Sequence, residues 1–192
     1  MTDVRIGKKA RISQGDIYKD VEFIEYAIEK DGVIEISKII FPFVIILTQD
    51  CDLQQDYSVR WAKSGSSDHD KKLISVIVAP LYNVEHVYLG DHLSDLKMKM
   101  TTITKNKTPG KTLRQNQTPR YHFIEFPQNI PIVSSVIDFK HYFTVNVEYL
   151  KKHKQNNFIC QIGPLYREDV SQRFSSFLSR IGLPEKEKNI EV

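Results

Sequence analysis

Apolar and polar residues alternate near the start of the chain in a way that predicts a β-hairpin. Val21 to Ile28 and Val33 to Ile40 carry apolar side chains at alternate positions, which is the period of a half-buried strand. The link between them ends in Asp31-Gly32, a dipeptide that favours a tight hairpin turn. We therefore predict two paired antiparallel strands.

Two largely apolar runs predict strands that are buried on both faces. Phe43 to Leu47 is rich in β-branched residues, and Leu73 to Ala79 repeats this pattern after a polar loop predicted over Gln54 to Lys72. Shorter strands are predicted over Tyr121 to Phe126, Val133 to Phe139 and Phe158 to Ile162.

Helical spacing is strongest near the C-terminus, after Gly163-Pro164. There the apolar residues form one stripe at helical spacing, consisting of Val170, Phe174, Phe177, Leu178 and Ile181. Gly182 and Pro184 end this predicted helix. A shorter helix is predicted over Val147 to His153, and a single helical turn over Asp91 to Leu96.

Many short strands and one strong helix predict a mainly β fold, a small antiparallel barrel closed by a C-terminal helix. A parallel sheet would need a helix between successive strands, and the sequence offers only one strong candidate. A chain of 192 residues favours a single domain. We predict this domain over residues 1–184 and a charged tail over 185–192.

The composition is that of an ordinary globular protein, with 41% hydrophobic residues and a net charge of +3. No apolar run approaches the roughly 18–20 residues of a membrane helix, and the basic N-terminus lacks the apolar core of a signal peptide. These features predict a cytoplasmic protein without a membrane partner, whose Cys51 and Cys160 stay reduced. Nothing in the sequence calls for a cofactor.

Positive charge is concentrated between Lys97 and Arg120, a segment without a single Asp or Glu. We interpret it as a long exposed loop whose cations contact nucleic-acid phosphates, and Tyr121 and Phe123 as residues able to stack on bases. The predicted nucleic-acid-binding residues are Lys97, Lys99, Lys105, Lys107, Lys111, Arg114, Arg120 and Tyr121.

Asp50, Cys51 and Asp52 follow the first buried strand and are predicted to line a pocket at the mouth of the barrel. A reactive thiolate needs a cationic neighbourhood, which two adjacent acids do not provide, and no histidine nearby has the spacing of a metal ligand. We therefore favour a structural role, in which Cys51 packs inward and one Asp caps the turn.

The sequence predicts no metal site, because its six histidines are scattered along the chain. His122 is the histidine that best fits a catalytic role, since it follows Arg120 and Tyr121 at the end of the basic segment. An ordinary surface histidine is the favoured interpretation of this residue.

A weaker pattern indicates a Mg²⁺-dependent nuclease. Asp138-Phe139-Lys140 follows an apolar run, as does the acid-x-Lys half of such sites, and Glu125 could supply a second carboxylate. Asp70 and Asp95 begin similar patterns, so the motif has little specificity. The candidate catalytic residues are Asp138, Lys140, Glu125 and His122.

Three blocks of the N-terminal half resemble the MazF/PemK toxins. They are Gly15-Asp16-Ile17-Tyr18, Pro42 to Asp50 and Val76 to Leu81. The resemblance implies an SH3-like barrel and cleavage of single-stranded RNA by an Arg and a Ser or Thr. This chain has Phe41 and Tyr82 at the corresponding positions, so the standard catalytic pair is missing.

The chain also resembles a bacterial family of small proteins. Its members share a TQ-x-CDL step, here Thr48 to Leu53, and a YRE-x-x-SQ-x-F helix that ends in a VGLP-like step, here Tyr166 to Pro184. This second resemblance implies a single fold along most of the chain and no particular activity.

Three functions remain open from the sequence. The first is a toxin-like or defence-associated SH3-barrel protein that binds RNA or DNA through the basic segment. The second is a nuclease, either a divergent endoribonuclease or a Mg²⁺-dependent enzyme using Asp138 and Lys140. The third is a protein-interaction module with a cognate partner, encoded in a toxin–antitoxin or defence operon. The apolar stripe of the C-terminal helix leaves room for a homodimer.

Overall fold

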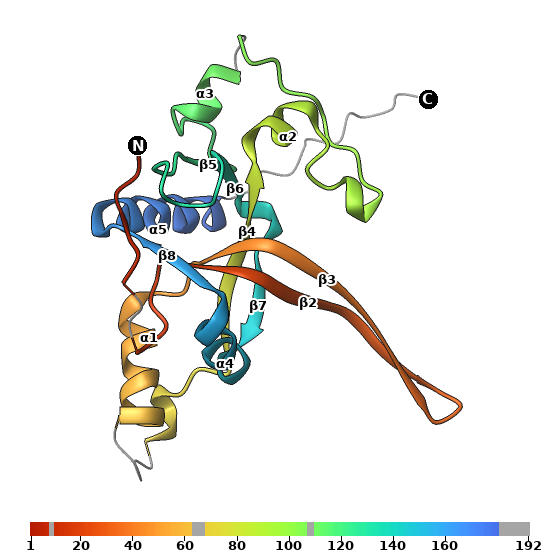
Figure 1. Ribbon diagram of the computed structural model, residues 1–192, viewed down its shortest axis with the longest axis vertical. Helices are drawn as coiled ribbons and strands as arrows, with labels where there is room; N and C mark the ends of the chain where they lie inside the picture. Colours follow the sequence, from red (N-terminus) through yellow and green to blue (C-terminus); the bar gives the residue numbers. More distant parts are fainter. Residues whose placement is uncertain (8–9, 63–67, 107–109, 181–192) are drawn as a thin grey trace, which may run out of the picture.

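A curled antiparallel sheet organises the structure. The computed structural model describes residues 1–7, 10–62, 68–106 and 110–180. Within these ranges one sheet has the strand order β1-β8-β2-β3-β4-β6-β5, and β7 pairs with β4 off this path. The sheet forms a half-barrel with helices packed around it (Figure 1). The predicted mainly β fold and antiparallel pairing are confirmed.

The described strands are β1 (Val4–Arg5), β2 (Asp16–Lys30), β3 (Val33–Ile46), β4 (Ser75–Asn83), β5 (Tyr121–Ile124), β6 (Ser135–Asp138), β7 (Phe143–Asn146) and β8 (Phe158–Ile162). The α-helices are α1 (Asp50–Tyr57), α2 (Val84–Leu89), α3 (Gly110–Arg114), α4 (Val147–Asn157) and α5 (Pro164–Leu178). Short helical turns are η1 (Ser58–Ala62), η2 (His69–Lys71), η3 (Ser94–Leu96) and η4 (Phe139–His141).

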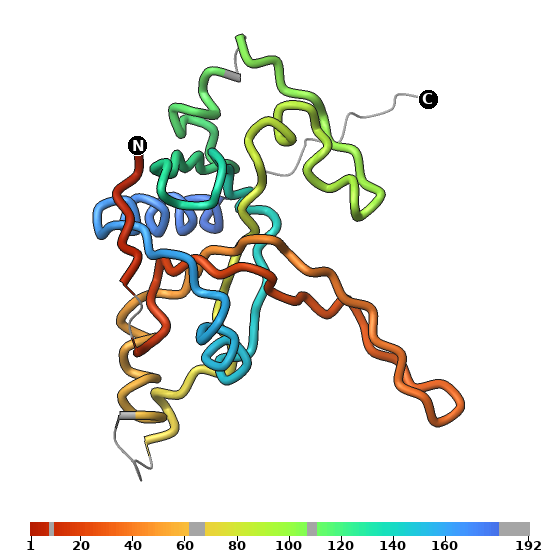
Figure 2. Tube along the Cα trace, viewed as in Figure 1, coloured from red at the N-terminus to blue at the C-terminus, as the bar shows by residue number. Residues whose placement is uncertain are grey.

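β2 and β3 form a long hairpin that projects from the body of the molecule (Figure 2). Its turn residues Asp31 and Gly32 have φ angles of 53° and 77°, the left-handed pair that a type I′ turn requires. The predicted hairpin is confirmed, but it is longer than predicted. The hairpin strand and the buried strand ending at Ile46 are one continuous β3.

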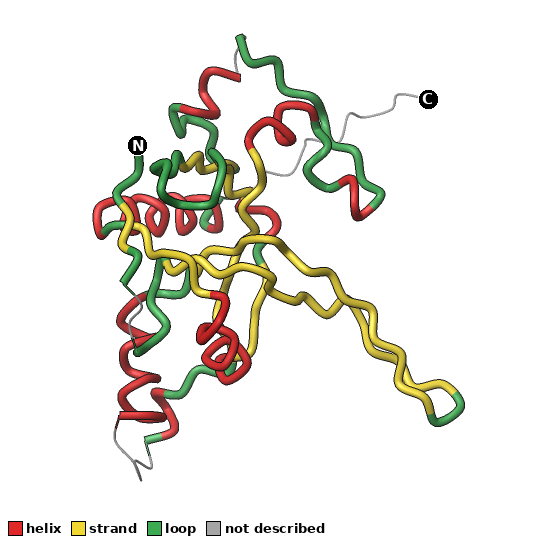
Figure 3. Tube along the Cα trace, in the orientation of Figure 1, coloured by secondary structure: helices red, strands yellow, loops and turns green. Residues whose placement is uncertain are grey.

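The projecting part of this hairpin, residues 22–40, is called the hairpin arm below. Figure 3 shows that it consists of strand and turn only, with no helix lying against its far end. Seven of its apolar side chains are roughly half exposed or more: Ile24, Tyr26, Ile28, Val33, Ile34, Ile36 and Ile40.

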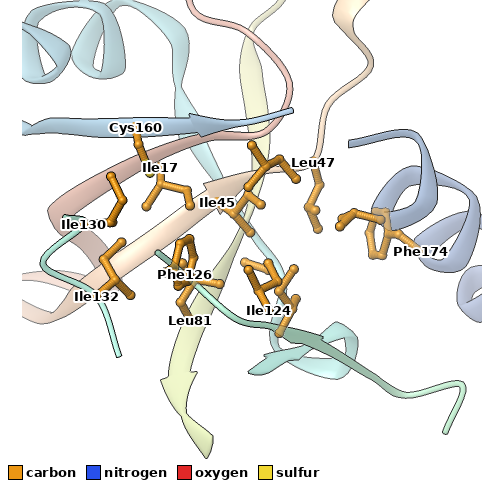
Figure 4. Close-up of a cluster of buried hydrophobic side chains, with 14 of the residues drawn as sticks. Ile17, Ile45, Leu47, Leu81, Ile124, Phe126, Ile130, Ile132, Cys160 and Phe174 are labelled. Atoms are coloured by element: carbon orange, nitrogen blue, oxygen red, sulfur yellow. The ribbon is translucent and has the colours of Figure 1, made fainter. Parts of the chain in front are cut away.

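Adjacent residues of β3 enter two different hydrophobic clusters, which confirms a strand buried on both faces. Ile45 belongs to the cluster that includes Cys160 of β8 and Phe174 of α5 (Figure 4). Its neighbours Val44 and Ile46 belong to the cluster that contains Leu150 of α4. Since successive strand side chains point to opposite faces, the half-barrel is packed on both sides.

A third cluster lies beneath the segment that follows β4. Tyr82 and Val136 from the sheet pack there with Tyr88 of α2 and Leu113 of α3. Leu113 is only 1% exposed, so the predicted long exposed loop over the basic segment is wrong in this part. A buried anchor fixes α3 against the sheet.

The predicted polar loop over 54–72 is also wrong where it overlaps α1 and η1. The helix carries Asp50 and Asp52 in its first turn, where negative charge is favourable. Its buried Asp56 accepts hydrogen bonds from Arg60 and from the backbone N–H of Leu73. These contacts fix a segment whose sequence lacks an apolar stripe.

Several other predictions are confirmed. β8 has the predicted bounds, α4 begins at Val147 and runs beyond the predicted His153, and α5 begins at Pro164. The predicted single turn is confirmed in part, since η3 covers only its second half, and α2 is an additional helix. Ile181, the predicted stop at Gly182 and Pro184, and the predicted tail lie outside the described residues.

Candidate functional site

Asp138 lies at the centre of a group of ionisable side chains where β6 meets η4. It is fully buried, and its Oδ1 caps η4 by accepting the backbone N–H of Lys140 at 3.0 Å. The turn carries His141 back over the strand end, so that its Nδ1 lies 3.3 Å from Asp138 Oδ2. That pair does not have hydrogen-bonding geometry.

Arg120 holds the same carboxylate through two hydrogen bonds. Its Nε donates to Asp138 Oδ1 at 2.8 Å and its Nη2 to Oδ2 at 2.5 Å. Tyr121 pairs with Asp138 across β5 and β6, so the residue before β5 reaches the end of β6. The hydrogen-bonded carboxylate raises the pKa of Arg120, and a bidentate pair of this kind is strong and fixed in direction.

Tyr82 and His92 complete this group, called the Asp138 cluster below. The ring of Tyr82 lies 4.9 Å from that of His92 and 5.8 Å from that of His141 between centroids. Among the described residues, the Tyr82 hydroxyl and both ring nitrogens of His92 are buried without a hydrogen-bond partner. Buried polar atoms are nearly always paired, so this cluster has unused bonding capacity.

Burial favours the neutral form of both histidines of the cluster. Desolvation lowers the pKa of His92 and that of His141, against the opposing charge of Asp138. The backbone of His86 raises the pKa of His92. The two groups do not have hydrogen-bonding geometry. Neutral imidazole nitrogens are available as acceptors or metal ligands.

Three side chains of the cluster could hold a metal. One ligand atom each from His92, Asp138 and His141 lies within 4.8 Å of the other two. The sequence predicted no metal site, because its histidines are scattered along the chain, and the structure brings His92 close to Asp138 and His141. The Asp138-x-x-His141 spacing across a turn was the only local signal.

An apolar hollow of about 200 Å³ adjoins the Asp138 cluster. Tyr82 and His141 line it together with residues from the base of the hairpin arm and from the segment around η3, including Phe23, Phe41, Leu93 and Met98. The resemblance to MazF/PemK toxins singles out Phe41 and Tyr82, and both line this hollow. The arginine of the Asp138 cluster, Arg120, lies elsewhere in the sequence, directly before β5.

A second hollow, of about 440 Å³, lies between α2 and α3 and is called the basic hollow. It is lined by Tyr88, Lys105, Asn106, Lys111, Arg114 and Gln115. Glu85 pairs with Lys105 and, at 3.4 Å, with Arg114. The hydrogen bond from Lys105 lowers the pKa of Glu85, and the single acid leaves the three cations with an excess of positive charge.

The other predicted nucleic-acid-binding residues lie in different surroundings. Lys97 and Lys99 are exposed, and Lys107 lies outside the described residues. Arg120 points inward to Asp138, with its Cζ 5.1 Å from the ring centroid of Tyr121. The basic segment therefore contributes to two places, the basic hollow and the Asp138 cluster.

The predicted barrel-mouth residues form the first turn of α1. Burial raises the pKa of Asp50, but hydrogen bonds from Arg11 and from the backbone N–H of Gln14 outweigh it and leave that pKa low. The predicted Asp cap of the turn is wrong, because α1 begins without a side-chain cap and Asp50 instead accepts a backbone N–H from a distant segment. The prediction that Cys51 packs inward is wrong, because α1 buries its Leu53 side and leaves Cys51 exposed.

The predicted Mg²⁺ residues are not brought together as a set. Asp138 is buried against Arg120, Lys140 is exposed, and the Glu125 carboxylate lies 3.4 Å from the N-terminal amine. His122 is 2% exposed, so its interpretation as a surface histidine is wrong. Its strand partner is the buried Ile137.

The Gly15-to-Tyr18 block supports the fold rather than a site. Asp16 is buried, and its Oδ2 accepts hydrogen bonds from Lys154 Nζ at 2.8 Å, Tyr18 Oη at 2.8 Å and the backbone N–H of Ser13 at 3.0 Å. Burial raises the pKa of Asp16, and Lys154 opposes this effect. The ion pair ties α4 to β2.

The described helices include none that is long and apolar enough to cross a membrane. Comparisons of the chain with protein-family models, with curated proteins and with solved structures found no match.

Proposed function

We propose that this protein binds nucleic acid at the basic hollow. The observation that carries this proposal is the gathering of Lys105, Lys111 and Arg114 around one hollow of about 440 Å³. Phosphate contacts by clustered cations supply most of the affinity of non-specific nucleic-acid binding. Asn106 and Gln115 on the same walls add amide groups that can donate to phosphate or to base edges.

The fixed position of the cations also favours this function. Arg114 Cζ lies 5.5 Å from the ring centroid of Phe123, and Lys105 Nζ lies 5.4 Å from that of Tyr88. Because the two cations also pair with Glu85, their side chains are already partly ordered, and less side-chain entropy is lost when they meet a phosphate. Lys111 adds a third exposed charge from α3.

The test is fluorescence anisotropy with labelled 12-residue RNA and DNA strands over a range of salt concentrations. The triple variant Lys105→Ala, Lys111→Ala, Arg114→Ala should bind about 10–100-fold more weakly. The slope of its log affinity against log salt concentration should be smaller by the equivalent of about two to three phosphate contacts. The matched control removes three lysines elsewhere, the partly exposed Lys19 and the exposed Lys30 and Lys152. Equal loss in the two variants would exclude a specific site.

We also propose that the half-barrel is of the SH3-like MazF/PemK type. The consecutive antiparallel pairing of β2, β3 and β4 supports this assignment, as do the three sequence blocks named above. An experimental structure should superpose on a MazF/PemK barrel over these strands, and a superposition limited to the hairpin would contradict the assignment.

A second candidate function rests on the hairpin arm. Register and alternation place Ile24, Ile34, Ile36 and Ile40 on one face of the arm, each more than half exposed. Exposed apolar patches of this kind mark interaction surfaces. The arm is acidic, with Glu22, Glu25, Glu29, Asp31 and Glu35 against Lys30 and Lys38, and the basic segment of the same chain has the complementary charge.

We therefore propose a second copy of this chain as the partner of the arm. Sedimentation velocity should show a concentration-dependent dimer that Ile34→Thr with Ile36→Thr weakens at least tenfold. Ile6→Thr with Ile74→Thr is the matched control, because both side chains are also exposed but lie outside the arm. A monomer at all concentrations would exclude this partner.

A further inference from the structure

Two atoms of the Asp138 cluster already have the separation of ligands on one metal ion. His141 Nδ1 and Asp138 Oδ2 lie 3.3 Å apart without forming a hydrogen bond. Zinc–ligand bonds of about 2.0–2.2 Å at a tetrahedral angle separate two ligand atoms by roughly 3.3–3.6 Å. His92 belongs to the same group, because one ligand atom each from His92, Asp138 and His141 lies within 4.8 Å of the other two.

One oxygen of the Asp138 carboxylate keeps an unused acceptor site. Asp138 Oδ1 accepts from Arg120 Nε and from the backbone N–H of Lys140, whereas Oδ2 accepts only from Arg120 Nη2 among the described residues. A carboxylate oxygen has two acceptor sites, so Oδ2 keeps one. It is Oδ2 that lies next to His141.

Tyr82 supplies an independent observation at the same place. Its side chain is 7% exposed, and its hydroxyl has no hydrogen-bond partner among the described residues. Its ring contacts the rings of His92 and His141. A water bound to a metal between these histidines would give the hydroxyl the partner that it lacks.

Arg120 fits this arrangement as an outer-shell residue. Groups that hydrogen-bond a ligating carboxylate orient it toward the metal, and the bidentate contact of Arg120 with Asp138 does so here. Two neutral imidazoles and one carboxylate match Zn²⁺ and neighbouring first-row ions rather than Mg²⁺ or Ca²⁺, which prefer all-oxygen sites.

We propose that His92, Asp138 and His141 bind one divalent transition-metal ion, represented by Zn²⁺, with a fourth position facing Tyr82 and the apolar hollow. This site is separate from the basic hollow, and its existence does not depend on nucleic-acid binding. Three protein ligands and one open position are typical of a metal site that admits a small ligand.

The experiment is isothermal titration of Zn²⁺ into the full chain, freed of metal by chelator and of any affinity tag. We expect one ion per chain with a dissociation constant below about 10 μM. His92→Gln and His141→Gln should each weaken binding by about 10–100-fold or more. His86→Gln is the matched control, because His86 is exposed on the neighbouring α2 and should leave binding unchanged.

Cobalt provides a second readout that is insensitive to small changes in stability. Co²⁺ in place of Zn²⁺ should give the visible absorption of a four-coordinate ion in the parent and in His86→Gln, and none in the double variant His92→Gln, His141→Gln. Circular dichroism of each metal-free variant verifies folding. The absence of saturable Zn²⁺ binding, or one tightly bound ion in the folded double variant, would overturn the proposal.

Discussion

Arg120 and Asp138 form a two-point ion pair that joins the start of β5 to the end of β6. Asp138 is fully buried, and Arg120 Nε and Nη2 lie 2.8 and 2.5 Å from its two carboxylate oxygens. The backbone N–H of Phe139 donates to the Arg120 carbonyl at 3.0 Å and reinforces the junction. The position of His141 depends on this junction, because η4 begins directly after Asp138.

Removal of the Arg120 guanidinium should therefore leave a buried charge without its partner. We expect Arg120→Met to lower the free energy of unfolding by about 3–5 kcal/mol, measured by urea denaturation. Arg114→Met is the control, since its pair with Glu85 is exposed and such pairs contribute about 0–1 kcal/mol. The double variant Arg120→Met, Asp138→Asn should recover part of the loss. Equal losses in Arg120→Met and in the control Arg114→Met would contradict a buried ion pair.

The regular elements of the fold could be predicted because their patterns are local. The type I′ turn at Asp31-Gly32 and the apolar run through Val44 and Ile45 depend on residues that are adjacent in sequence. α1 could not be predicted, because a long-range contact holds it: Asp56 accepts the backbone N–H of Leu73.

The candidate site was less predictable for the same reason. The prediction located Asp138 and Arg120 separately, as a candidate catalytic residue and as a phosphate contact. Their pairing depends on the β5–β6 register, and His92 joins them only because the chain returns over the sheet after α2. No spacing in the sequence indicates that His92 lies close to Asp138.

The buried pair of Asp16 and Lys154 should be essential for stability. Lys154→Met leaves Asp16 with the hydroxyl of Tyr18 and one backbone N–H but without its ion-pair partner. We expect a loss of about 3–5 kcal/mol in thermal or urea unfolding. Lys152→Met on the exposed side of α4 should change stability by less than about 0.5 kcal/mol. A comparable effect at the two positions would mean that the Lys154 charge is not needed.

Gly90 should not tolerate a side chain. Its φ is 75°, and an added Cβ would collide with the backbone carbonyl of Met100. Gly32 has nearly the same φ, 77°, but open space around it, so Gly32→Ala measures the backbone strain alone, about 1 kcal/mol. Gly90→Ala should cost about 2 kcal/mol more than that. Equal values in denaturant unfolding would show that the segment around Met100 can move away.

Glu85 should restrain nucleic-acid binding at the basic hollow. It neutralises part of the charge of Lys105 and Arg114, so Glu85→Gln should tighten RNA or DNA binding by about 3–10-fold at low salt, measured by anisotropy. Glu148→Gln, which removes an exposed acid paired with Arg60, is the control for net charge. An unchanged affinity in Glu85→Gln would place the nucleic acid elsewhere.

His122 should make the protein sensitive to acid. Burial, assisted by the positive charge of Arg173, lowers the pKa of His122 to about 3, and the exposed carboxylate of Asp169, 4.0 Å away, does not offset this. The unfolded chain protonates His122 below its ordinary pKa of about 6.5, while the folded chain does not. Stability is therefore fully present above about pH 6.5 and is lost progressively as the pH falls toward 3.

The variant His122→Phe removes this titration and keeps a ring of similar size next to Phe139. Between pH 7.5 and pH 5 the parent should lose about 2 kcal/mol relative to the variant, measured as the difference in unfolding free energy at each pH. His69→Phe serves as the control, because His69 lies in η2, far along the chain from this strand, and should follow the parent. Parallel pH profiles for the parent and His122→Phe would show that His122 is protonated equally in the folded and unfolded chain.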